Sequence, residues 1–137
     1  MAWFGFEKKF IKIFNACFDF LIDKYGFKFI RVENEGLFLK IVYKNKSTGL
    51  VVSYDRREGV FLYLVVLEGE DVGKYTNKRW FLVEKLLKVA GEDGVFDNPK
   101  RVSFGSYSYI KSSLEQYALV LKKHGHSVLL GDFSSLR

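Results

Sequence analysis

The sequence predicts a single α+β domain spanning residues 1–137, and three observations carry this prediction. Short β-branched and aromatic runs alternate with glycine-bearing turns between Phe27 and Glu68. A phenylalanine recurs at every fourth position near the N-terminus, and helical patterns return in the second half. With 24 aromatic residues and one proline in 137, the chain has the composition of a packed core. We expect an antiparallel meander of about four strands, a long N-terminal helix, and two or three further helices.

The first element expected is a helix from about Phe6 to Tyr25. Its side chains four residues apart are apolar, and such residues touch on a helix surface. Gly26 follows where a left-handed residue commonly ends a helix. The apolar surface extends well around this helix, so it either packs against several neighbours in the monomer or meets another chain. Its stripe is Phe6, Phe10, Ile13, Phe14, Cys17, Phe18 and Leu21.

Four short strands with tight turns between them should follow as sequential hairpins. The strand from Leu37 alternates apolar and mixed residues, which predicts one buried face. The strand from Val60 to Leu67 is apolar on both faces, which predicts a central place in the sheet or helical cover on each side. The expected strands begin at Phe27, Leu37, Leu50 and Val60.

The second half predicts helices from Arg79 to Gly91 and from Ser112 to His124. Asn77 and Ser113 are the expected caps, with Gln116 three residues after Ser113 in a capping-box arrangement. A short strand is possible in the segment 101–104. The buried stripe of the last helix should comprise Leu114, Tyr117, Ala118 and Leu121.

Charge and cysteine content limit the class of protein. Residues 1–73 carry 11 basic and 10 acidic side chains, and residues 74–137 carry 11 and 6, so the basic excess lies in the second half. This excess is either ordinary solubility charge or attraction to an acidic partner or nucleic acid. The lone Cys17 predicts a reducing compartment, and charged residues interrupt the apolar N-terminal segment. We therefore expect a cytosolic protein with no membrane partner.

Catalytic and metal sites have few candidate residues. His124 and His126 flank Gly125, and a metal would need Asp132 as a third ligand. The alternative is that His124 complements the C-terminus of a helix. A Ser-His-Asp set with Ser134 lacks a nucleophile-elbow motif, and Cys17 falls within an apolar stripe. We predict no enzyme activity, no cofactor and no metal.

Basic and aromatic residues supply the candidate partner-binding positions. The turn from Asp55 to Glu58 holds two arginines, which either grip an anionic group or are neutralised by the flanking acids. Further lysines and arginines lie among aromatics, a combination that also suits single-stranded nucleic acid. The candidates are Arg56, Arg57, Lys74, Lys78, Arg79, Trp80, Lys100 and Arg101.

The C-terminal segment resembles a group of small bacterial proteins of unassigned function. The shared features are Tyr117-Ala-x-x-Leu-Lys-Lys followed by Leu129-x-Gly-Asp-Phe-Ser. The segments Phe18-Asp-Phe-Leu-Ile-Asp-Lys-Tyr-Gly-Phe and Tyr54-Asp-Arg-Arg-Glu-Gly look like two further landmarks of the group. Some members look like immunity proteins of bacterial toxin systems, so the resemblance implies a binder of another protein. We expect a non-enzymatic protein-binding domain, immunity-like, with a self-association partner or nucleic acid as the alternatives.

Overall fold

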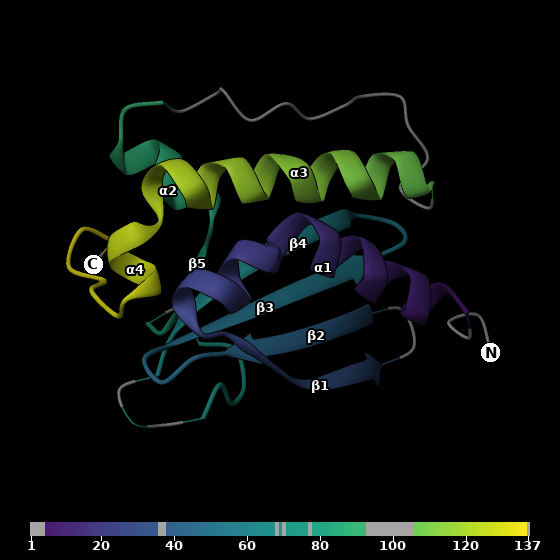
Figure 1. Cartoon of the computed structure of the whole chain (residues 1–137), viewed down its shortest axis with the longest axis horizontal. Coiled ribbons are helices and arrows are strands. Elements are labelled where there is room, and N and C mark those ends of the chain that lie inside the picture. The colour runs from purple at the N-terminus through teal and green to yellow at the C-terminus, as the bar shows by residue number, and fades with distance from the viewer. Residues whose placement is uncertain are drawn as a thin grey trace.

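The strand-rich stretch after Gly26 forms an antiparallel sheet with helices on one face (Figure 1). A computed structural model describes residues 5–35, 38–67, 69, 71–76, 78–92 and 106–136. The α+β class and the antiparallel sheet are confirmed, and the described sheet has five strands where about four were expected. The elements are α1 (Phe6–Tyr25), β1 (Lys28–Glu35), β2 (Phe38–Lys44), β3 (Thr48–Asp55), β4 (Gly59–Val66), β5 (Trp80–Leu82), α2 (Glu84–Val89), α3 (Tyr107–His124) and α4 (His126–Leu129).

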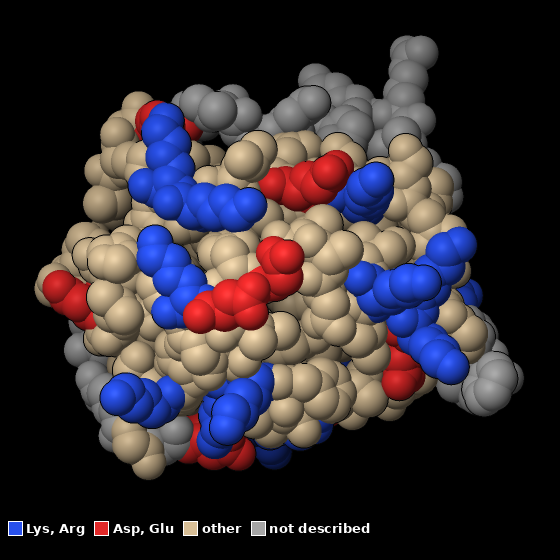
Figure 2. All heavy atoms as spheres, in the orientation of Figure 1, with Lys and Arg blue, Asp and Glu red and all other residues tan. Residues whose placement is uncertain are grey.

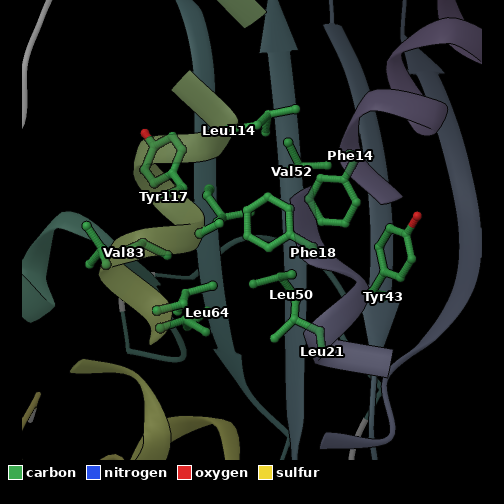
Figure 3. Packing of buried hydrophobic residues seen from close by; sticks show 14 of the residues in the cluster. Phe14, Phe18, Leu21, Tyr43, Leu50, Val52, Leu64, Val83, Leu114 and Tyr117 are labelled. Carbon is green, nitrogen blue, oxygen red and sulfur yellow. The ribbon is translucent and has the colours of Figure 1, made fainter. Parts of the chain in front are cut away.

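Helix α1 has the predicted bounds and buries Phe10, Phe14 and Phe18 of the predicted stripe, and Phe6 is half-buried. Phe14 stacks on Phe18 with ring centroids 4.4 Å apart and on Tyr43 of β2 at 4.8 Å. These rings fill the space between α1 and the centre of the sheet (Figure 3). Gly26 ends the helix with φ of 70°, a left-handed conformation that glycine adopts without steric cost.

The sheet follows chain order, β1-β2-β3-β4-β5, with every neighbouring pair antiparallel. The predicted helix from Arg79 is wrong over its first residues, because Trp80–Leu82 form a strand. Backbone bonds from Val66 N to Arg79 O (2.8 Å) and from Val83 N to Leu62 O (3.0 Å) flank this strand. Short apolar runs fit either element, and pairing with the free edge of β4 decides for the strand.

Helix α3 begins five residues before the predicted start, and its predicted cap is wrong. Ser106 is the cap, with its Oγ accepting a bond from Tyr109 N at 3.1 Å. Ser113 is buried within the helix, facing the core with the predicted stripe. The predicted Asn77 cap and the strand suggested at 101–104 lie outside the described residues.

The main core lies between the sheet and the pair α1 and α3 (Figure 3). Two tyrosines of α3 reach the start of β4: Val60 N donates to Tyr109 Oη, and Tyr117 Oη donates to Val60 O, both at 3.2 Å. Asn45 Nδ2 donates to Tyr25 O at 2.9 Å and to Leu129 O at 3.0 Å. That single amide joins the β2–β3 turn to the ends of α1 and α4.

The opposite face of the sheet explains the two-sided apolarity of β4. The chain after β4 folds back across this face and carries Val72, which is fully buried. A central place and a covering loop therefore bury the second face, and among the described residues no helix lies on it. The cluster there contains Val42, Val51, Val65, Leu67, Val72 and Trp80.

Candidate functional site

The face of the sheet opposite the helices carries a groove, called here the open-face groove. It consists of two hollows of about 220 Å³ and 390 Å³ that share Lys40, Val51, Tyr75 and Trp80. The hollows adjoin through these shared residues and extend along the strands from Val72 toward Phe38. The remaining lining residues are Arg31, Glu33, Phe38, Val42, Ser53, Tyr63, Val72, Gly73 and Lys74.

Strand alternation builds the floor of the open-face groove. Side chains two apart on a strand share a face, so Phe38, Lys40 and Val42 point away from the helices. The register sets Lys40 opposite Ser53 and Val42 opposite Val51. The core-facing residues between them are fully buried under α1. The floor is thus apolar beneath the loop, at Val42 and Val51, and Lys40 and Ser53 form its polar part next to Phe38.

Three aromatic side chains form one wall of the groove. Tyr63, Tyr75 and Trp80 meet edge-to-face with ring centroids 5.5–6.1 Å apart, a favourable aromatic geometry. Trp80 is 7% exposed, whereas Tyr75 is 59% exposed. Burial also raises the pKa of Tyr63. Tyr75 is therefore the exposed ring of the triad, and it packs against the more buried Tyr63 and Trp80.

The loop that forms the second wall is tied to the sheet by polar contacts. Arg79 donates from Nε to Val66 O at 3.0 Å and from Nη2 to Asp71 O at 2.8 Å. The Asp71 carboxylate lies 3.3 Å from Lys44 Nζ and 3.6 Å from Arg31 Nη1. The backbone N–H of Val72, then Lys44, lower the pKa of Asp71. These ties set the wall before any partner arrives.

Much of the positive charge on this face is already paired within the chain. Arg31 Nε lies 2.7 Å from Glu33 Oε2, and Arg31 and Lys44 share Asp71. Lys74 is exposed at the rim, where an incoming acidic group can reach it. The groove is mildly basic and does not form a continuous cationic track.

The structure places the described members of the predicted binding set in two locations. Lys74 and Trp80 line the open-face groove, Arg79 anchors its wall, and Lys78 is exposed beside Arg79. Arg56 and Arg57 lie on the β3–β4 turn. Lys100 and Arg101 lie outside the described residues. The prediction therefore found part of one wall and missed the floor.

The arginine turn has an internal acceptor. Asp55 is buried and accepts bonds from Arg57 N at 2.7 Å and from Arg57 Nη2 at 3.3 Å. Burial alone would raise the pKa of Asp55, but the bonds from Arg57 outweigh it, so the pKa lies below its ordinary value. The sequence left open whether these arginines grip an anionic group or are neutralised by the flanking acids. For Arg57, the flanking Asp55 is the partner.

The groove residues absent from the predicted binding residues include Arg31, Lys40 and Tyr63. Lys40 had a usable signal, because the mixed face of its strand was already visible in the alternation. Arg31 and Tyr63 reach the groove from β1 and β4. Knowing that requires the register of three strand pairs, which one sequence does not supply.

The residues considered for chemistry have separate partners. His124 bonds Glu92, His126 Nδ1 lies 2.8 Å from Tyr25 Oη, and Ser134 Oγ donates to Asp132 at 2.7 Å. Throughout the part of the chain that the structure describes, no three His, Cys, Asp or Glu side chains are grouped to hold a metal. His124 lies in the last turn of α3, as predicted for a cation at a helix C-terminus.

The helix-bearing face has a different surface from the open face. A hollow of about 340 Å³ between α1 and α3 is lined by Cys17, Lys111 and Glu115 among others. Burial raises the pKa of the Cys17 thiol, so it is a weaker nucleophile than an exposed one. Figure 2 shows basic and acidic side chains interspersed over the middle of this face, with basic side chains grouped toward its right-hand end.

Comparisons with protein-family models, with curated proteins and with solved structures gave no match to this chain. None of the described helices combines the length and apolar character that crossing a membrane requires.

Proposed function

We propose that this chain is a non-enzymatic protein-binding domain and that the open-face groove receives a segment of its partner. The supporting observation is the groove itself, a hollow between an aromatic triad and a tethered loop. Concave sites with apolar walls and a few polar groups are the usual binding sites of proteins. Pre-set walls lower the ordering cost of binding.

The chemistry of the walls favours an extended segment with an apolar and an acidic side chain. Tyr75 offers an exposed ring for the apolar group, and the exposed Lys74 lies beside it as a cation. Tyrosine is enriched at interface centres because one large rigid ring buries area at low entropic cost. A toxin-system protein, as the immunity-like resemblance implies, is the first partner to test.

A nucleic-acid partner receives less support from the same groove. Stacking of bases needs exposed ring faces, and Trp80 is buried while Tyr63 is half-buried. Phosphate binding needs unpaired cations, and Arg31 and Lys44 already contact Asp71. We further propose that the protein acts in the cytosol, since its lone cysteine predicts a reducing compartment.

Affinity capture with matched variants tests the proposal. The groove variant carries Lys74→Glu and Tyr75→Ala, and the control carries Lys111→Glu and Leu119→Ala on α3, with the same charge change and similar exposure. We expect a protein retained by the wild type and the control but not by the groove variant. Retention by none of the three, or equal retention by the groove variant, contradicts the proposal. Salt-sensitive binding of a single-stranded oligonucleotide that the groove variant loses would favour the nucleic-acid alternative.

A further inference from the structure

The outer edge of β1 is the long exposed edge of the described sheet. Among the described strands, β1 has 8 residues and pairs only with β2, whereas β5, at the other edge, has 3 residues. Figure 1 shows β1 as the outermost strand, beyond β2. Phe29 and Ile30 are 48% and 37% exposed. An edge with unpaired N–H and C=O groups is a template for a further strand.

The charges of β1 are ordered along the strand and share one face. The register pairs Lys28 with Lys44, Arg31 with Val42, and Glu33 with Lys40, all on the open face. A bulge between Phe29 and Arg31 lets Ile30 drop out of this alternation, which keeps Lys28 and Arg31 on the same face. The register also pairs Glu35 with Phe38. The order is therefore basic in the first half and acidic in the second.

We propose that β1 pairs with β1 of a second copy of this chain, antiparallel, about a two-fold axis at Val32. With the bulged Ile30 passed over, this register sets Lys28 opposite Glu35 and Arg31 opposite Glu33 of the copy. Val32 then meets Val32 of the copy on the helix-bearing face. All four charges meet opposite charges, and the pairing is self-complementary as a two-fold contact requires.

Other registers and directions lack this match. A parallel copy sets basic residues beside basic residues, and a shift by one residue moves the charges to the other face. Charged residues and a bulge on an edge commonly deter random strand addition. Here the same charges reject an unrelated strand and fit a copy of themselves. The contact involves one strand from each copy, so its area is small and the dimer should dissociate on dilution.

Sedimentation of the full chain over a range of concentrations, with charge-swapped variants, tests the proposal. Variant A carries Lys28→Glu and Arg31→Glu, and variant B carries Glu33→Lys and Glu35→Lys. Each variant turns four attractive pairs of the dimer into repulsive ones, so self-association should weaken by on the order of a hundredfold. Mixing A with B restores opposite charges at every pair, so a mixed dimer should form. The control, with Lys111→Glu and Lys122→Glu on α3, should dimerise as the wild type does.

Crosslinking gives a second measurement that does not depend on the charge swaps. In a Cys17→Ser background, Val32→Cys lies on the proposed axis and should form a disulfide with its copy on mild oxidation. Asn34→Cys, which the register sets opposite Phe29, should crosslink at least tenfold more slowly. A wild type that stays monomeric at millimolar concentration overturns the proposal. So do folded A and B that fail to associate when mixed, or equal crosslinking at positions 32 and 34.

Discussion

Substitution of Gly49 by alanine is a sharp test of how the open face is covered. Gly49 lies on β3 directly beneath the loop that follows β4. A Cβ added there would lie 2.8 Å from Val72 Cγ2 and 3.1 Å from Val65 Cβ. Both neighbours are β-branched and therefore have few rotamers to which they can retreat. The loop carrying Val72 must move outward to admit the methyl group.

The magnitude follows from two opposing effects. Overpacking of a well-filled site costs about 1–3 kcal/mol. Replacing glycine by alanine returns about 0.4–1 kcal/mol, because the unfolded chain loses conformational freedom. With the middle of each range, the net expectation is a loss of about 1.3 kcal/mol in the free energy of unfolding. The groove should change as well, since Val72 and Gly73 line it.

Urea unfolding followed by far-UV circular dichroism measures the loss. In a Trp3→Phe background, tryptophan fluorescence reports the surroundings of Trp80. The matched control is Ser53→Ala, four residues further along the same face of β3, which adds no volume. We expect the control to stay close to the wild type in midpoint and emission. If Gly49→Ala is as stable as the wild type and its emission is unchanged, Val72 does not close over Gly49, and the account of the second face is wrong.

Three further predictions address Phe14 in the main core, Asn45 in the β2–β3 turn, and Glu92, which follows α2 and contacts the end of α3. Phe14→Ala should lower the free energy of unfolding by about 3–5 kcal/mol, because it opens a cavity at the centre of the main core, as urea titration would show. Asn45→Ala should cost about 1–3 kcal/mol by leaving carbonyls at the ends of α1 and α4 without their donor, and faster amide exchange in both segments would distinguish local loosening from a global effect. The pKa of Glu92 is lowered by the bond from Lys123 and then by that from His124, so the stabilisation is present above the ordinary glutamate pKa and is lost as the pH falls through the lowered value. Glu92→Gln should therefore be less stable than the wild type near pH 7 and converge with it as the pH falls below the ordinary glutamate pKa. Convergence at high pH instead would reverse the assignment.

The sequence pattern was sufficient to predict helix α1 and the first four strands, because their signals lie in residues close together in the chain. Helix α1 has a four-residue aromatic repeat with a glycine stop, and the first four strands have glycine-bearing turns. Each of these signals lies in a helical repeat or in the turn between two consecutive strands. The two errors in the second half have a different origin. Trp80–Leu82 are strand because β4 offers a free edge, and α3 starts at Tyr107 because Ser106 supplies the cap.

The candidate site was predictable to the extent that one segment contributes to it. Lys74 and Trp80 were recognised as basic and aromatic neighbours, and both line the groove. Arg79 was selected as a contact residue, but the structure uses its guanidinium to tether Asp71 and Val66. A run of charged residues in a sequence does not reveal which cations form hydrogen bonds or ion pairs within the chain. That distinction depends on the fold of the loop.

The two-sided apolarity of β4 connects the groove and the β1 edge. A second helical layer would have buried the whole open face. In the described chain one loop covers it instead, and Val72 anchors that loop. The loop covers the apolar part of the face and leaves Lys40, Ser53 and Tyr75 lining a hollow. Because Asp71 ties that loop to Arg31 of β1, a copy of β1 that draws Arg31 toward its own Glu33 would loosen one tether of the groove wall. Dimerisation through β1 and binding in the groove should therefore be coupled. The coupling should be negative, because both contacts compete for Arg31. A partner that orders the loop therefore favours the monomer, and its affinity should fall as the concentration of the chain rises.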